Sequence, residues 1–252
     1  MTGILLRLAG PLQSWGERSA FGVRDTAPFP TRSALTGMFA AAEGRSRDQA
    51  PDAYADLGFT VRIDRPGLRM VDFHTIGGGL PPNLTAATSA GGHKKTAVLS
   101  YRHYLADAVF TVAVTGPPEC LERITEALRR PHWAPYLGRR SCPPDEPLVL
   151  RGPHHDPLTE LTTRAPLSVP PPADPGRATV PVEFLWDTAP AHLPEDAPVL
   201  DVTDMPESFA PADRRYRTRR LYRTVEQLPA RLCIEPCDLA RTLIDYALEV
   251  PA

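Results

Sequence analysis

The chain has 252 residues, long enough for one large domain or two small ones, and its 28 basic and 30 acidic side chains leave a net charge of −2 at pH 7. This balance excludes a uniformly basic coat for nucleic acid, although it allows a basic patch. No stretch approaches the roughly 18 apolar residues of a membrane span, and we expect no signal peptide at the start. The 30 prolines favour strands and loops over long helices.

The four cysteines do not form paired CxxC motifs; they are Cys120, Cys142, Cys233 and Cys237. A structural zinc site normally needs such pairs, so we expect free thiols, no metal and no cofactor. Free thiols are typical of a reducing cytoplasm, where we expect the chain to be located.

The first part of the chain alternates strands and a helix. Residues 4–8 form an apolar run and residues 59–63 alternate apolar and polar side chains, so both are predicted strands. Between them, Thr31 or Ser33 can cap a helix that continues through residues 35–42.

Residues 74–103 interrupt this pattern with glycine and proline pairs and little apolar material, which predicts a long projecting loop or hairpin. A strand over residues 109–114 follows, and then a helix that begins at Pro117-Pro118. The order is strand, helix, strand, insertion, strand, helix. This is the order of a ferredoxin-like unit.

The composition changes after this unit. The stretch from Pro153 to Pro181 holds eight prolines in 29 residues. We therefore predict a first domain over residues 1–152, a proline-rich linker over residues 153–180 and a small β-rich domain over residues 181–252, whose first strand starts a second sheet.

Charge is also segregated along the chain. Residues 178–213 contain eight acids and no lysine or arginine, and residues 214–223 then contain six arginines. As a strand, this run would place Arg215, Arg217 and Arg219 on one face. It could contact RNA or neutralise the acids before it, and we expect its main effect on folding or assembly, with the larger RNA contribution from Arg139 and Arg140.

The segment after the first strand is a candidate nucleotide site, with an amide, a hydroxyl and an indole in Gln13, Ser14 and Trp15. Trp15 could stack on a base while Gln13 and Ser14 bind a base edge or a phosphate. A buried tryptophan that anchors a turn fits the same residues.

A second candidate site lies at the start of the first helix, shortly after Arg24. Thr31, Arg32 and Ser33 place two hydroxyls and a guanidinium at a helix N-terminus, where free N–H groups and the helix dipole favour a phosphate. Ordinary helix capping, with Arg24 paired to an acid, explains the same pattern.

The predicted projecting segment and its flanks gather basic and aromatic residues. They are His74, His93, Lys94, Lys95, Tyr101, Arg102, His103 and Tyr104. Metal-independent RNA cleavage needs a base for the 2′-hydroxyl and an acid for the leaving oxygen, and these residue types supply both. A solvated basic loop that grips an RNA backbone fits equally well, because no spacing forces the side chains together.

The loop after the second helix contains Gly138, Arg139, Arg140 and Ser141. A glycine and two arginines in a tight loop allow backbone and guanidinium groups to approach a phosphate closely. A plain surface turn is the alternative.

Together these segments are far more specific than any one alone. The sequence resembles the CasD family of subtype I-E CRISPR systems, a family of the RAMP superfamily of RNA-binding proteins. The matching segments are residues 8–16 (LAGPLQSWG), 21–26 (FGVRDT), 30–37 (PTRSALTG), 104–110 (YLADAVF) and 136–144 (YLGRRSCPP). Arg32 stands where many relatives have lysine.

The resemblance implies an α+β fold with a ferredoxin-like, RRM-like palm and a β-hairpin thumb at about residues 74–103. It also implies a subunit of the Cascade surveillance complex that holds the 5′ handle of the CRISPR RNA in antiviral defence. The implied partners are the CRISPR RNA, the CasC backbone subunit beside the thumb, the large CasA subunit and, through the assembled complex, target DNA. The candidate residues named above are the expected RNA contacts.

Catalysis is a separate question. Relatives in subtype I-C cleave precursor RNA with tyrosine, lysine and histidine side chains, whereas in subtype I-E the resemblance assigns that cut to CasE. The motifs match the I-E branch better, so we expect RNA binding without cleavage. Two alternatives stay open: a metal-independent endoribonuclease, and an assembly module whose basic residues contact protein acids.

Overall fold

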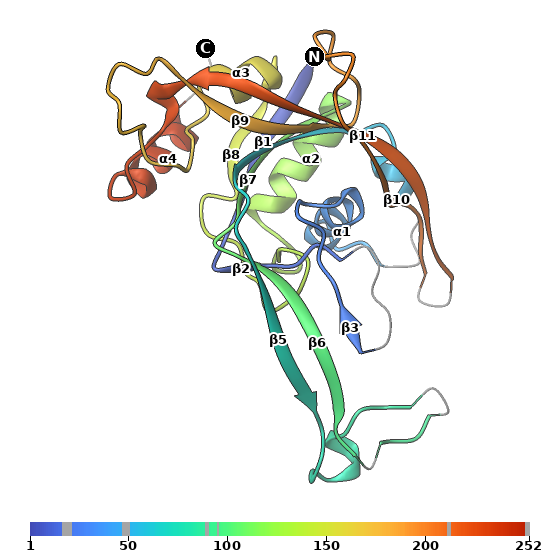
Figure 1. Cartoon of the computed structure of the whole chain (residues 1–252). Helices are drawn as coiled ribbons and strands as arrows, with labels where there is room; N and C mark the ends of the chain where they lie inside the picture. Colours follow the sequence, from blue (N-terminus) through green and yellow to red (C-terminus); the bar gives the residue numbers. More distant parts are fainter. Residues whose placement is uncertain (17–21, 47–50, 89–90, 95, 211–212, 250–252) are drawn as a thin grey trace.

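The structure is a computed structural model that describes residues 1–16, 22–46, 51–88, 91–94, 96–210 and 213–249. In chain order its elements are β1 (Thr2–Ala9), β2 (Leu12–Gln13), β3 (Val23–Arg24), α1 (Arg32–Ala42), η1 (Pro51–Tyr54), β4 (Gly58–Arg65), β5 (Leu68–Ile76), η2 (Pro82–Leu84), β6 (Val98–Ala106), β7 (Val109–Thr115), α2 (Pro118–Arg129), β8 (Val149–His155), α3 (Pro157–Thr163), β9 (Thr179–Trp186), β10 (Val199–Ala210), β11 (Asp213–Pro229), η3 (Ala230–Leu232) and α4 (Leu239–Leu248). The expected α+β class is confirmed (Figure 1). Within the described residues, no helix has both the length and the apolar character needed to cross a bilayer.

The body is one antiparallel sheet of seven strands in the order β10-β11-β9-β4-β7-β1-β8. β1 lies near one edge and pairs with β7, from Gly3 opposite Thr115 to Ala9 opposite Val109. The elements β1, α1, β4, β7, α2 and β8 follow one another as strand, helix, strand, strand, helix, strand, and their strands are neighbours in the order β8-β1-β7-β4.

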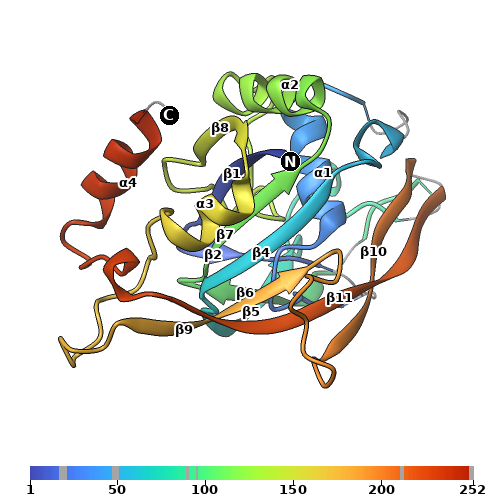
Figure 2. The ribbon, with the colours of Figure 1, turned by 90° about the horizontal axis from the view of Figure 1, so that it is seen from above.

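Alternation along β1 separates two hydrophobic cores, because successive side chains point to opposite faces of a strand. Ile4, Leu6 and Leu8 join the core that α1 and α2 cover, and Leu5 joins the core that α3 and α4 cover. Figure 2 shows α1 and α2 on the same side of the central strands. The sheet is therefore covered on both faces.

The C-terminal strands continue this sheet. The prediction of a second sheet is wrong, because β9 pairs with β4, from Thr60 opposite Trp186 to Ile63 opposite Glu183. An alternating pattern identifies a strand and its buried face but not its neighbour. The predicted linker also contains α3, whose Leu161 is buried in the second core. The division into two domains stays a prediction.

β5 and β6 form a two-stranded ribbon that extends away from the sheet (Figure 1). Pairing runs from Leu68 opposite Ala106 to Ile76 opposite Val98, so the ribbon starts before the predicted insertion at residue 74. β2 and β3 pair with β6 nearer the body. Apolar side chains on both faces of β5 hid this strand from an alternation test.

Candidate nucleic-acid interface

The Gln13-Ser14-Trp15 segment is buried where the ribbon meets the body. The Gln13 amide nitrogen donates to the carbonyls of Leu8 (3.0 Å) and Ala108 (2.8 Å), and its oxygen accepts from Trp15 Nε1 (3.1 Å). Trp15 is only 1% exposed. In this structure its indole offers no free face to a base, and the segment anchors a turn.

Ser14 joins this segment to two other parts of the chain. Its hydroxyl donates to the His103 carbonyl in β6 at 2.9 Å, and its backbone N–H donates to the Leu137 carbonyl at 3.1 Å. Gly138 has a positive φ of 82°, and a Cβ there would overlap the carbonyl oxygen of Ser14. The segment thus connects the sheet, the ribbon and the loop after α2.

The N-terminus of α1 is closed by a carboxylate of the chain itself. The Arg32 backbone N–H donates to Asp204 Oδ2 at 2.6 Å, and the Arg32 guanidinium pairs with Asp187 at 2.9 Å. Thr31 is fully buried, and the Ser33 hydroxyl lies 3.4 Å from the Thr31 hydroxyl. Asp204 therefore occupies the position where the sequence predicts an RNA phosphate.

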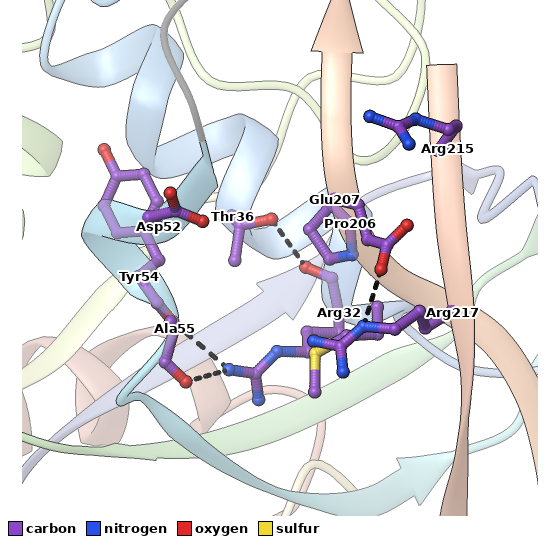
Figure 3. A pocket seen from close by; sticks show the side chains of 10 residues that line it. Arg32, Thr36, Asp52, Tyr54, Ala55, Pro206, Glu207, Arg215 and Arg217 are labelled. Carbon is purple, nitrogen blue, oxygen red and sulfur yellow. Dashed lines mark hydrogen bonds and ion pairs between the residues drawn. The ribbon is translucent and has the colours of Figure 1, made fainter. Parts of the chain in front are cut away.

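A cavity of about 370 Å³ lies beside this helix end, between α1, η1 and the hairpin of β10 and β11 (Figure 3). In it, Arg32 donates to the carbonyls of Tyr54 and Ala55, and Arg217 pairs with Glu207 at 2.9 Å. Burial lowers the pKa of the Arg32 guanidinium, and the neighbouring Asp187 opposes this shift. These groups hold the strands against the helix.

Most arginines of the predicted basic strand pair with acids around it. The pairs are Arg215 with Asp213, Arg217 with Glu207, Arg219 with Asp204 and Asp187, and Arg223 with Glu183. The hypothesis that this run neutralises the acids before it is confirmed for these four arginines.

Four other candidates meet at the base of the ribbon, and we name Arg24, Arg102, Tyr104 and Arg139 the basal cluster. Arg24 lies beside Arg102 in the parallel register of β3 and β6, and the Arg139 guanidinium lies 4.7 Å from the centre of the Tyr104 ring. Hydrogen bonds of these arginines go to the Ser100 hydroxyl and the Arg24 carbonyl, and none of the three arginines pairs with a described carboxylate.

The basal cluster keeps hydrogen-bonding capacity for a ligand. Arg139 Nη1 is buried and has no hydrogen-bond partner among the described residues. A buried donor without an acceptor costs about 1–3 kcal/mol, which an oxygen of a bound anion would offset. Guanidinium groups suit this role because their planar N–H groups match phosphate geometry.

The remaining ribbon candidates do not form one group. His74 lies 3.4 Å from Asp72, and Lys94 is exposed near the outer end. His103 pairs with Val71 across the ribbon, so the two side chains share one face. Val71 and His74 are three positions apart in β5, so His74 lies on the other face. Lys95 lies outside the described residues, as does Phe21 of the matching segments.

One face of the ribbon is apolar and exposed. Val71, Phe73, Leu99 and Tyr101 share this face, each about half exposed, and the rings of Phe73 and Tyr101 are 5.4 Å apart. We name these four residues the apolar ribbon face. A contiguous exposed apolar patch of this kind marks an interaction surface.

Arg140 and Ser141 are exposed on the loop after α2, and Arg140 lines a groove of about 810 Å³ along α1. Trp133, which is 49% exposed, and Tyr216 line the same groove. Sequence reasoning missed Trp133, because a lone tryptophan after a helix carries no periodic signal. Tyr216 was visible only as one member of the arginine run.

Three of the four free thiols are buried, and Cys237 is exposed. Cys120, Cys142 and Cys233 are buried and free, and burial raises the pKa of each thiol, so all three stay protonated at neutral pH. Among the described residues, no three His, Cys, Asp or Glu side chains are arranged to hold a metal ion.

Comparison with known proteins agrees with these observations. The family model for CRISPR-associated proteins of the Cas5 type matches residues 3–222. The chain belongs to the Cas5 family. Cascade subunit CasD of Escherichia coli strain K12 is 39% identical to this family member over 164 residues, which are 58% of this chain and 69% of CasD.

Solved structures of Cas proteins resemble this Cas5 family member over nearly its whole length. A chain of a CRISPR RNA-guided surveillance complex matches it with a TM-score of 0.87 and 47% identity, over 98% of this chain and 100% of that one. A crystal structure of a Cas protein matches with a TM-score of 0.62 and 30% identity, over 93% and 98% of the two chains. The resemblance to the CasD family is confirmed.

Proposed function

We propose that this chain is a non-catalytic RNA-binding subunit of a type I-E Cascade complex and holds the 5′ repeat-derived handle of the CRISPR RNA. The CasD relative and the 47% identical chain of a surveillance complex support this assignment. The basal cluster carries the RNA-binding part, because its three arginines have no described carboxylate partner and the Arg139 guanidinium lies 4.7 Å from the centre of the Tyr104 ring. Single-stranded RNA offers phosphates and unstacked bases to such a set.

The fold assignment belongs to the same proposal. The unit β1-α1-β4-β7-α2-β8 is a ferredoxin-like RAMP palm, and the ribbon of β5 and β6 is its thumb. The strand order β8-β1-β7-β4 with antiparallel neighbours supports the palm, and the projection of the ribbon supports the thumb (Figure 1).

The partners follow from the surfaces. The apolar ribbon face supports a protein neighbour at the thumb, which we assign to the CasC backbone subunit. We assign CasA and the CRISPR RNA as further partners in the cytoplasm, and target DNA as a partner of the assembled complex.

The basal cluster is tested in a complex coexpressed with its neighbours. Arg102→Ala with Arg139→Ala should release RNA and lower the salt slope of log affinity by roughly 0.7 per lost phosphate contact. The matched control is Arg130→Ala with Arg241→Ala, because those side chains are 86% and 88% exposed, the first directly after α2 and the second on α4. Equal RNA retention and equal slopes in both double variants would contradict the proposal.

Absence of catalysis is tested separately. The variant with His74, His93, Lys95 and His103 all changed to Ala should process precursor RNA normally in cells that keep CasE. The purified chain should leave repeat RNA uncut in EDTA. Specific cuts by the wild-type chain that disappear in the variant would establish the endoribonuclease alternative.

A further inference from the structure

The groove along α1 has a floor of small side chains. Ala34, Gly37 and Ala41 recur there at helical spacing, and a Cβ at Gly37 would meet no atom within 4 Å. The floor is therefore open enough for a flat group to lie against the helix.

Aromatic side chains line the groove from two separate parts of the chain. Trp133 and Tyr136 come from the loop after α2, and Phe209 and Tyr216 come from the hairpin of β10 and β11. Trp133 and Tyr216 are 49% and 38% exposed, so their rings are accessible. Aromatic faces of this kind stack on nucleobases of any identity.

The charge of the groove is positive. Its described lining residues include Arg45, Arg140 and Arg214 and no aspartate or glutamate. Arg45 already pairs with Glu43 at 2.5 Å, but neither Arg140 nor Arg214 pairs with a described carboxylate. Two guanidinium groups without a described carboxylate partner, one from each of these parts of the chain, suit a phosphodiester.

The groove adjoins the basal cluster. Arg139 belongs to the cluster and Arg140 lines the groove, so one peptide unit, about 3.8 Å between Cα atoms, separates them in the chain. A strand whose phosphates contact the cluster can therefore place its next nucleotides in the groove.

We infer that this groove binds one or two unstacked nucleotides of the RNA, with a base against its aromatic side chains and phosphate at Arg140 and Arg214. The inference rests on the proposed function and adds a second contact site to it. The volume of about 810 Å³ falls in the range of ~300–1,000 Å³ that small-molecule sites occupy.

The test uses the complex assembled with handle RNA that carries 4-thiouridine or 6-thioguanosine at one position at a time. Ultraviolet cross-linking and peptide mapping should place one or two adjacent positions on Trp133 or Tyr216. Trp133→Ala with Tyr216→Ala should abolish those cross-links and weaken handle binding about 5- to 150-fold, the equivalent of ~1–3 kcal/mol for a lost stack. Trp133→Phe with Tyr216→Phe should keep most of the affinity.

The role of the two arginines of the groove is tested with a double variant and a matched control. Arg140→Ala with Arg214→Ala should weaken handle binding and lower the salt slope, while Arg130→Ala with Arg241→Ala removes the same charge elsewhere and should do neither. Melting temperatures of all variants exclude unfolding as the cause.

The outcomes separate this inference from the proposed function. If groove variants keep every cross-link and full affinity while the Arg102 and Arg139 double variant loses RNA, the groove inference is overturned and the proposed function stands. If the wild-type complex binds no handle RNA, the proposed function fails. If groove variants release a protein subunit but bind RNA normally, the groove is a protein site and the inference is overturned.

Discussion

Two tryptophans show how strongly the surroundings decide a residue's role. Trp15 is 1% exposed and donates to Gln13 inside the turn, whereas Trp133 is 49% exposed at the edge of a groove. The sequence pointed to Trp15 as the stacking residue because it sits in a motif with Gln13 and Ser14. Burial is a property of the assembled fold, and a short motif does not contain it.

Replacing Trp15 should therefore affect folding. Trp15→Ala removes a large side chain from the core and is expected to lower the free energy of unfolding by about 3–5 kcal/mol. Urea unfolding measures this, and Trp133→Ala is the control, because its half-exposed ring should contribute far less to stability. An unchanged unfolding curve for Trp15→Ala would contradict the buried role.

Gly138 should be equally sensitive for a backbone reason. Gly138→Ala forces an L-residue into positive φ, which costs about 1–2 kcal/mol, and drives its Cβ into the Ser14 carbonyl oxygen. Gly37→Ala is the matched control, because the helix interior there has free space and should gain about 0.5–1 kcal/mol. Thermal unfolding measures the stability of both variants. Equal effects would contradict the close contact between Gly138 and the Ser14 carbonyl oxygen.

At the level of elements, α1 depends on strands that follow it by more than 150 residues. Asp204 of β10 accepts from the first N–H of α1 and also pairs with Arg219 of β11. The sequence predicted the helix and two possibilities for its N-terminus, ordinary capping or an RNA phosphate. It did not predict that a carboxylate of the same chain binds there. A contact between residues so far apart has no local sequence signature.

Two arginines of β11 should behave very differently when changed to Met. Arg219→Met leaves Asp204, which is 1% exposed, as a buried carboxylate without its ion-pair partner and with only the Arg32 N–H as a described donor, so we expect a loss of about 3–5 kcal/mol. Arg217→Met breaks an exposed pair with Glu207, which is worth about 0–1 kcal/mol. Denaturant unfolding of the two variants compares them, and a similar cost for both would show that the buried pair is not special.

The contact of α4 with the body should make stability fall at alkaline pH. Burial and a 2.7 Å hydrogen bond to Glu160 raise the pKa of Tyr246. Above the ordinary tyrosine pKa of about 10, the unfolded chain releases a proton that the folded chain keeps, so the free energy of unfolding decreases as pH rises. Unfolding measured from pH 7 upward should show a shallower decline in Tyr246→Phe, and an identical decline would contradict this assignment.

Helices and strands with clear periodicity were predictable from sequence, and their partners were not. Residues 4–8, 59–63 and 109–114 became β1, β4 and β7, because alternation or an apolar run reflects burial directly. The joining of β9 to β4 depends on pairing across more than 100 residues. The long β5 was missed because its apolar residues lie on both faces and are mostly exposed, so they show no alternation.

For the whole molecule, the ribbon is the surface that sets the behaviour of the isolated chain. An exposed two-stranded ribbon with a half-exposed apolar face is marginal in water and prone to association. Phe73→Ser with Tyr101→Ser should therefore raise the soluble monomeric fraction of the free chain and lower its incorporation into the complex. Size-exclusion chromatography measures both, and Thr75→Ser is a control on the same face of β5.

The same double variant also distinguishes the apolar ribbon face from the RNA-binding surface. Handle RNA affinity of the remaining assembled complex should stay close to wild type, because Phe73 and Tyr101 lie on the face opposite Arg102. A loss of RNA affinity equal to that of the basal cluster variant would place RNA on the apolar ribbon face.

The hydrogen bonds of Ser14 give the molecule a form of thermodynamic linkage. Ser14 binds the ribbon through the His103 carbonyl and binds the loop of Arg139 through the Leu137 carbonyl. In the proposed complex, a neighbour that orders the ribbon would through these two hydrogen bonds also help to order the loop of Arg139, so both binding events would share part of the ordering entropy. Thermodynamic reciprocity then requires equal effects in both directions. Bound RNA would raise the affinity for the neighbour by the same factor by which the bound neighbour raises the affinity for RNA. Incomplete assemblies would in this way release both components more readily than the finished complex.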